Sequence, residues 1–304
     1  TDELALMRNA TEAIDTILQG IDFRKGEEIV YGIYDYPFVQ NTILQLEKRK
    51  GIKAIPATYN IAADPDKAIV NACKIALSPK TRLLCLTHIL NWNGRKLPVE
   101  EIIAIAKRNN TEVLLDGAQS FAHIPFSLDD IDPDYFAACY HKWFRGPLGT
   151  GFIHIKKDNV DKIWPLHGEN QKRSGNIENF QHLSTLDFPA FLSINKGFER
   201  ISQHSIAEEL SRKKSLNQKI YDAFRNVNGI SPMIPGRNYV RNGILSYSLL
   251  SEDPGKFVNR MYEKYKLILK PIRYRHLKGF RISISDDIGE KDVEFFIDTV
   301  KKEL

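Results

Sequence analysis

Short apolar runs that alternate with helix-length segments constrain the fold of this chain more than any other feature. Residues 82–88 and 112–116 are largely apolar, and helical patterns lie before, between and after them. Strands and helices that alternate in this way are typical of βαβ units, which build a mainly parallel sheet. The pattern therefore predicts an α/β fold. We expect its strands at residues 28–32, 52–56, 82–88, 112–116, 135–140 and 151–155.

The C-terminal part of the chain has a different pattern. Residues 189–227 indicate one or two long helices, and shorter strand and helix patterns alternate after them. We therefore expect two domains. Residues 1–195 form a large domain around the mainly parallel sheet, and residues 196–304 form a small α+β domain.

The composition is that of an ordinary globular protein, with 42% hydrophobic and 27% charged residues. The net charge of +5 is spread over short basic groups, so we expect no nucleic-acid binding. No stretch approaches the length of a membrane-spanning helix and no signal peptide is visible, so we expect a cytoplasmic protein that does not bind a membrane. The sequence begins at Thr1 directly in patterned residues. We expect that the true N-terminus is not included, which leaves a removed targeting segment open.

The three cysteines, Cys73, Cys85 and Cys139, form no CxxC pair, and their number is odd. We expect buried free thiols, no disulfide framework and no metal site.

Residues that directly follow strands are the candidate site residues, because ligands of parallel sheets bind at the carboxyl ends of the strands. Asp116 ends an apolar strand, so its carboxylate is desolvated unless it is paired. It could cap a helix or a turn, or it could pair with the protonated ring nitrogen of a pyridine cofactor. Gln119 could donate a hydrogen bond to a phenolate oxygen of the same ring, since Gly117 and Ala118 let a flat ring approach the backbone.

Lys142 follows the next strand, between His141 and Trp143, and a glycine-rich turn comes after it. A lysine in a desolvated setting can act as an amine nucleophile, although a structural role is an equal alternative for this residue alone. Asn9 begins an amphipathic helix, whose free N–H groups could bind a phosphate together with Thr11.

Together these segments resemble the class V aminotransferase family of pyridoxal 5′-phosphate (PLP) enzymes, and most of all its isopenicillin N epimerase-like branch. The resemblance implies the PLP-dependent transferase fold (fold type I). It extends from Asn9 to the last helix. The matching motifs are Arg8-Asn9-Ala10-Thr11-Glu12-Ala13, Asp35-Tyr36-Pro37, Leu115-Asp116-Gly117-Ala118-Gln119 and His141-Lys142-Trp143.

The resemblance also implies a role for each matched residue. Lys142 would hold PLP as a Schiff base and move the Cα proton, and Asp116 would pair with the pyridine nitrogen. Arg281 would bind the α-carboxylate of an amino-acid substrate, with Asn91 near the substrate and the ring hydroxyl. The other cofactor-binding residues would be Ala10, Thr11, Tyr36, Gln119, His141 and, from the partner subunit of a homodimer, Thr185.

Three features depart from the family pattern. Ser184 stands where relatives have a glycine before the threonine, and Cys139 stands where they usually have Ser or Asn. The sequence also lacks the several dozen residues that relatives carry before the Ala-Thr-Glu motif, so we expect that it is a fragment or that those residues exist but were not included.

The resemblance therefore implies a PLP-dependent enzyme that acts on an amino acid by transamination, epimerisation or lyase chemistry. Cysteine desulfurase chemistry is less expected, because residues 271–278, just before Arg281, contain no cysteine. A PLP-fold binding or regulatory protein without catalysis is the alternative, and the presence of Lys142, Asp116, Gln119 and Arg281 argues against it.

Overall fold

The computed structural model describes residues 2–168, 175–181, 185–234 and 242–304, which form two compact units. The first unit comprises the chain up to Asn60 together with Asp64–Ile89 and Leu97–Gln203, and the second comprises Ile61–Ala63, Leu90–Lys96 and His204–Leu304. The domain border proposed after residue 195 lies within helix α6 (Phe188–Gln203), all of which belongs to the first unit.

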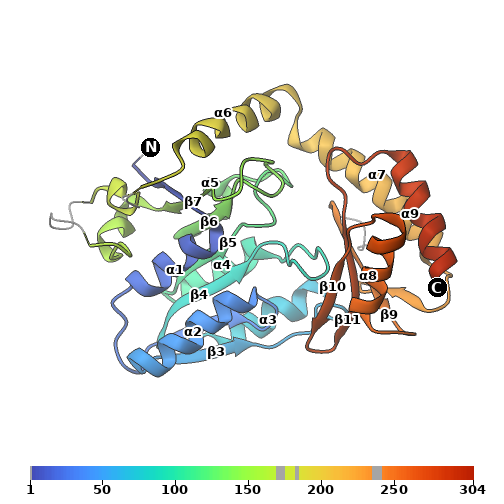
Figure 1. The fold of residues 1–304 in the computed structure, drawn as a ribbon. Coiled ribbons are helices and arrows are strands. Elements are labelled where there is room, and N and C mark those ends of the chain that lie inside the picture. The colour runs from blue at the N-terminus through green and yellow to red at the C-terminus, as the bar shows by residue number, and fades with distance from the viewer. Residues whose placement is uncertain (1, 169–174, 182–184, 235–241) are drawn as a thin grey trace. The chain divides into compact units, whose positions relative to one another are not determined.

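The sheet of the first unit has seven strands among the described residues, in the order β1-β7-β6-β5-β4-β2-β3 (Figure 1). Six strands share one direction, and β7 runs antiparallel to both of its neighbours. The predicted α/β fold with a mainly parallel sheet is confirmed. The strands are β1 (Leu4–Met7), β2 (Glu28–Gly32), β3 (Lys53–Ala57), β4 (Thr81–Thr87), β5 (Glu112–Asp116), β6 (Tyr135–Cys139) and β7 (Gly151–Ile155).

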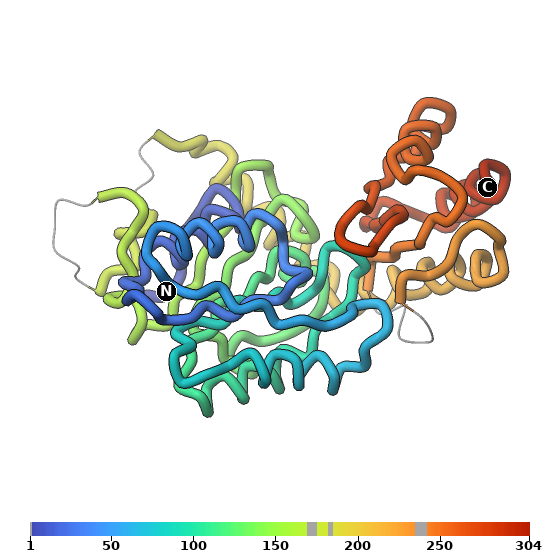
Figure 2. Tube along the Cα trace, turned by 90° about the horizontal axis from the view of Figure 1, so that it is seen from below, coloured from blue at the N-terminus to red at the C-terminus, as the bar shows by residue number. Residues whose placement is uncertain are grey.

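Helices cover both faces of this sheet, as right-handed crossovers between parallel strands require (Figure 2). Helices α1 and α2 pack on the face that carries Ile29, Leu83 and Leu114, whereas α3 and α4 lie on the opposite face. The helices of this unit are α1 (Ala10–Gly20), α2 (Pro37–Lys50), α3 (Asp66–Ala76), α4 (Val99–Arg108), the short α5 (Leu128–Ile131) and α6, with 3-10 turns at Lys157–Lys162 and Ile177–Phe180.

Helix α1 begins for an identifiable local reason, and its position matters for the site. The Asn9 side chain accepts a hydrogen bond from the backbone N–H of Glu12 at 2.9 Å, which caps the helix. Ile14, Ile17 and Leu18 repeat at helical spacing and are buried in the core. Each contributes about 1.5–3 kcal/mol to stability by burial, which fixes the N-terminus of α1 against the sheet.

The second unit is built on a four-stranded antiparallel sheet in the order β10-β11-β9-β8. Its helices pack through a separate core that includes Phe224, Phe257 and Phe280. The strands are β8 (Ile230–Pro232), β9 (Ile244–Leu249), β10 (Lys270–Tyr274) and β11 (Leu277–Ser283), and the helices are α7 (Ile206–Phe224), α8 (Pro254–Tyr265) and α9 (Glu290–Glu303). No helix of the described residues is long and apolar enough to span a bilayer.

Residues 90–96 follow β4 and Ile89 in the chain, yet they belong to the second unit. The Ser246 hydroxyl donates to the Trp92 carbonyl at 2.6 Å, and the Asn242 amide donates to the Gly94 carbonyl at 2.6 Å. Gly94 has a φ of +75°, and a Cβ there would lie 2.7 Å from the backbone oxygen of Ile244. Only glycine fits this close approach, so the loop is held firmly on the second unit.

Candidate cofactor site

The site is built where parallel strands of the first unit end at one edge of the sheet. Asp116 ends β5, and β6, which runs parallel to it, ends at Cys139 and leads to Lys142. Ala10, at the N-terminus of α1, packs in a small buried cluster with Ala118 and Cys139. The start of α1 and the segments after β5 and β6 therefore meet at this edge.

The Asp116 carboxyl group is held by the turn that follows it. Its Oδ1 accepts a hydrogen bond from the Ala118 N–H at 2.8 Å. Burial raises the pKa of Asp116, whereas the nearby Lys142 charge and the Ala118 N–H lower it. A Cβ on Gly117 would lie 2.0 Å from the Phe136 ring, so the turn requires glycine. The outcome is a desolvated carboxyl group with a fixed orientation, suited to a cationic partner.

The Gln119 side chain is bound to Trp143 across the two strand ends. The Trp143 indole N–H donates to Gln119 Oε1 at 3.0 Å. The His123 ring stacks on the Trp143 ring, with centroids 3.5 Å apart and planes 11° from parallel. This arrangement was not predicted from the sequence, which indicated only that Gln119 and Trp143 follow adjacent strands.

Lys142 is solvent-exposed, and its amine forms no hydrogen bond or ion pair with another described residue. The loop around it is tightly closed. The N–H of Gly146 donates to the Tyr140 carbonyl at 2.7 Å, and the Thr150 hydroxyl donates to the Pro147 carbonyl at 2.6 Å. A fixed backbone thus carries an amine that is available for a covalent bond.

The first turn of α1 leaves backbone donors available. Asn9 binds the N–H groups of Glu12 and Ala13, whereas those of Ala10 and Thr11 have no hydrogen-bond partner among the described residues. Free N–H groups at a helix N-terminus favour an anion such as a phosphate.

Three further predicted residues differ in how they are placed. His141 follows β6, and burial together with the Lys142 charge lowers its pKa, which favours the neutral imidazole. Tyr36 lies at the start of α2, partly exposed, with its ring stacked on Phe38. Thr185 is exposed, and no contact joins it to the residues above; Ser184 lies outside the described residues.

Asp35 is a buried residue of this edge to which sequence reasoning gave no role. It accepts a hydrogen bond from the Gly32 N–H at 2.8 Å. Burial raises the pKa of Asp35 to about 7, hydrogen bonds from Thr87 and Gly32 act in the opposite direction, and the Asp116 charge raises it further. Its position in the Asp-Tyr-Pro motif was the available signal.

The two predicted substrate-binding residues lie together in the second unit. Arg281 on β11 donates from Nη1 to the Asn91 carbonyl at 2.7 Å. Its Nε is buried without a hydrogen-bond partner, and burial lowers the pKa of Arg281. No described carboxylate forms an ion pair with it, and Asp286, which follows β11 in the chain, binds Lys213 at 2.6 Å. Arg281 is therefore a desolvated cation with donors to spare.

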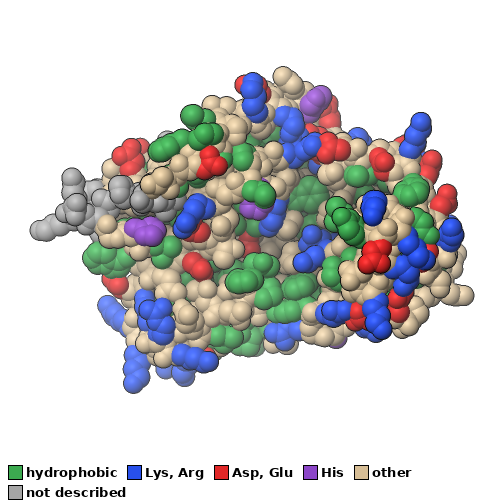
Figure 3. All heavy atoms as spheres, in the orientation of Figure 1, with side chains coloured by type: hydrophobic (Ala, Val, Ile, Leu, Met, Phe, Trp, Pro, Cys, Tyr) green, Lys and Arg blue, Asp and Glu red, His purple; other side chains and the backbone are tan. Residues whose placement is uncertain are grey.

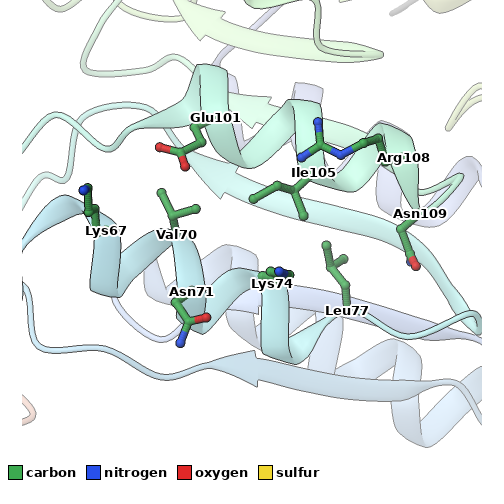
Figure 4. A pocket seen from close by; sticks show the side chains of 9 residues that line it. All are labelled: Lys67, Val70, Asn71, Lys74, Leu77, Glu101, Ile105, Arg108 and Asn109. Atoms are coloured by element: carbon green, nitrogen blue, oxygen red, sulfur yellow. The ribbon is translucent and has the colours of Figure 1, made fainter.

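A groove of about 660 Å³ between α3 and α4 contains none of these residues (Figure 4). Exposed basic side chains and a few apolar ones line it. Its lining is Lys67, Val70, Asn71, Lys74, Leu77, Glu101, Ile105, Arg108 and Asn109.

Most of the chain matches the sequence profile of one known protein family. The sequence profile of the family "Aminotransferase class-V" matches residues 1–263. The chain belongs to this family. The class V assignment drawn from the motifs is confirmed, and PLP is accordingly the cofactor.

The curated relatives of this class V protein carry different activities. A probable cysteine desulfurase of Methanothermobacter thermautotrophicus is 26% identical over 84% of this chain and 64% of its own length. An isopenicillin N epimerase of Amycolatopsis lactamdurans is 22% identical over 77% of this chain and 64% of its own length. The chain thus spans just under two thirds of these relatives.

Solved structures confirm fold type I for this class V protein. A mutant of C-DES with glycine covalently linked to the PLP cofactor matches with a TM-score of 0.87 and 22% identity, covering 99% of this chain and 80% of that chain. The apo cysteine desulfurase of Thermococcus onnurineus matches with a TM-score of 0.88 and 18% identity, covering 99% and 79%.

The residues of the first unit fit PLP. PLP carries an aldehyde, a ring nitrogen and a phosphate. The unpartnered amine of Lys142 suits the aldehyde, and the desolvated Asp116 carboxyl group suits the protonated ring nitrogen. The free N–H groups of α1 suit the phosphate. All three come from elements that meet at one sheet edge.

Proposed function

We propose that this protein is a PLP-dependent enzyme that acts on an amino acid and binds its α-carboxylate through Arg281. The observation that supports this most is the state of Arg281, a half-buried residue whose Nε is buried without a partner and whose charge no described carboxylate neutralises. A buried cation of this kind is costly unless a ligand supplies the counter-charge. A carboxylate matches the planar fork of an arginine with two parallel hydrogen bonds.

The roles proposed for the first unit follow from the chemistry of each group. PLP, when bound, withdraws electrons from the substrate carbon that carries the amino group. Lys142 would hold the cofactor covalently and then move the proton at that carbon. Asp116 would keep a proton on the ring nitrogen, and Gln119 would donate to the ring oxygen. Ala10 and Thr11 would bind the phosphate. Tyr36 and His141 would also bind the cofactor, and Asn91 would lie near the substrate and the ring hydroxyl.

The chemistry that follows removal of the proton is proposed to be transamination, epimerisation or a lyase reaction. Cysteine desulfurases among the relatives favour a second candidate, sulfur transfer to a cysteine of the chain. Against it, burial raises the pKa of Cys73 to about 12 and that of Cys139 to about 11, and the pKa of the buried Cys85 is raised as well. The β10–β11 hairpin turns at Arg275 and His276 and offers no cysteine.

Replacement of Arg281 by lysine tests the proposal. The variant keeps the charge but loses the fork, so substrate affinity should fall by about 2–5 kcal/mol while PLP affinity changes little. The measurement is a titration of the cofactor absorption band with a panel of amino acids and with amines that lack a carboxylate.

Arg260→Lys is the matched control, because Arg260 lies in the same unit and binds Glu252 and Glu303 near the surface. It should leave amino-acid affinity unchanged. Equal affinities of wild type and Arg281→Lys, or equal binding of the amines, would refute carboxylate recognition by Arg281. A wild-type protein with bound PLP and no spectral response to any amino acid would favour the non-catalytic alternative.

We further propose that the protein is a homodimer in which Thr185 binds the phosphate of the partner subunit. Helix α6, which follows Thr185, exposes Phe188, Leu192 and Phe198 by more than half of their area, and hydrophobic side chains are visible along it in Figure 3. Exposed apolar side chains close together favour a protein interface. Light scattering should give the mass of a dimer, and Leu192→Asp should give a monomer with weakened PLP binding. A wild-type monomer with a full complement of PLP would contradict this.

A further inference from the structure

Gln119 is the residue whose orientation decides whether the cofactor ring oxygen meets a donor or an acceptor. Its side-chain amide has one end of each kind, and rotation by 180° exchanges them. An indole N–H donates and cannot accept. The 3.0 Å contact with Trp143 Nε1 therefore requires the oxygen of Gln119 at that end.

The nitrogen of the same amide is then left for another partner. Gln119 Nε2 forms no hydrogen bond with a described residue. A phenolate oxygen needs donors, so this is the end that suits the ring oxygen of PLP. The opposite orientation would present a carbonyl oxygen to an oxyanion and would turn the amide N–H₂ group, itself a donor, toward the Trp143 N–H.

The Trp143 ring is itself fixed by the segment that carries Gln119. His123 is fully buried, and its Nδ1 donates to the backbone carbonyl of Gln119 at 2.8 Å, since a carbonyl oxygen can only accept. Its ring lies parallel to the indole at 3.5 Å. The backbone carbonyl of Trp143 accepts a hydrogen bond from the Arg200 guanidinium of α6 at 3.2 Å. Both the plane and the backbone of Trp143 are thus held.

We propose that Trp143 is a positioning residue, whose indole N–H holds the Gln119 amide with its N–H₂ group available to the ring oxygen of PLP. The proposal rests on the proposed function, in which PLP is bound to Lys142. Trp143 acts on the cofactor through Gln119 and does not itself react.

The pH dependence of the cofactor absorption tests this role. The negative charge of the ring oxygen stabilises a proton on the neighbouring Lys142 nitrogen. A hydrogen bond donated to this oxygen reduces that effect and so lowers the pKa of the nitrogen. Loss of the donor should raise the pH midpoint of the absorption change. Trp143→Phe keeps the aromatic ring for His123 and removes the N–H, so we expect an upward shift of roughly half a pH unit to one.

Three comparisons separate this role from a merely structural one. Gln119→Ala should shift the midpoint in the same direction, and Trp143→Phe should add nothing in that background. Trp143→His restores a ring N–H and should return the midpoint toward the wild-type value, which also covers the case in which Trp143→Phe folds poorly. Trp164→Phe is the matched control, because Trp164 donates to Asp22 at 2.9 Å in the same unit and should leave the midpoint unchanged.

An unshifted midpoint in Trp143→Phe, or an equal shift with and without Gln119, would overturn the proposal. These outcomes differ from failure of the proposed function, in which the wild-type protein itself would show no pH-dependent cofactor band and no label on Lys142 after borohydride reduction.

Discussion

Lys142→Ala is expected to fold like the wild type and to lose all covalently bound PLP, together with at least several orders of magnitude of turnover. The fold should survive because the Lys142 side chain is exposed and its amine bonds to no other described residue. The loop is held instead by backbone bonds such as the one from Gly146 to the Tyr140 carbonyl. Activity should be lost because no other group would supply the amine that attaches the cofactor and moves the substrate proton.

Borohydride reduction followed by peptide mass spectrometry measures this directly. In the wild type, the cofactor label should be on the peptide that contains Lys142, and in the variant no lysine should be labelled. Lys74→Ala is a suitable control, since Lys74 is an exposed residue of α3 at the groove in Figure 4. It should retain both label and turnover. A label on a different lysine of the wild-type protein would show that Lys142 has been assigned wrongly.

The parallel strands could be predicted from the sequence because burial on both faces leaves a continuous apolar run. Residues 82–88 and 112–116 gave β4 and β5 within one residue at each end. Strand β1 could not be recognised, because its four residues pair along one edge with β7 and are buried only in alternation. So short a pattern does not distinguish a strand from other conformations.

In the candidate site, too, some features could be predicted from the sequence and others could not. The position of Asp116 at the end of its strand follows from local sequence, and so does that of Lys142 after the next strand. The contacts that orient the groups do not, because they join residues far apart in the chain. Gln119 and Trp143 are separated by 24 residues, and Asn91 and Arg281 by 190. Residues 90–96 likewise join the second unit through contacts with Ser246 and Asn242, about 150 residues away in the chain.

Asp116→Asn is expected to retain PLP but to lose about 10²–10³-fold in turnover, the scale on which loss of one preorganised electrostatic partner acts. The asparagine oxygen can still accept the Ala118 N–H, so the turn should keep its form. The neutral amide, however, no longer favours a proton on the ring nitrogen, and the ring becomes a weaker electron acceptor. Asp132→Asn is the matched control in the same unit. Asp132 binds Lys107 and Lys156 at the surface and has a left-handed backbone that asparagine tolerates, so turnover should stay as in the wild type.

The same substitution should have the opposite effect on the stability of the protein without cofactor. Burial raises the pKa of Asp116, so the folded chain binds this proton more tightly than the unfolded chain does. The carboxylate therefore costs stability as the pH rises from about 4, the value of an unfolded aspartate, through the raised folded value. Near pH 8 the Asn variant without PLP should melt at a higher temperature than the wild type, and the difference should shrink in acid. With PLP bound, the wild type gains an ion pair at the ring nitrogen that the variant lacks. The difference in melting temperature should therefore become smaller or change sign. If Asp116→Asn instead melts lower at every pH and turns over normally, the carboxylate serves the turn and not the cofactor.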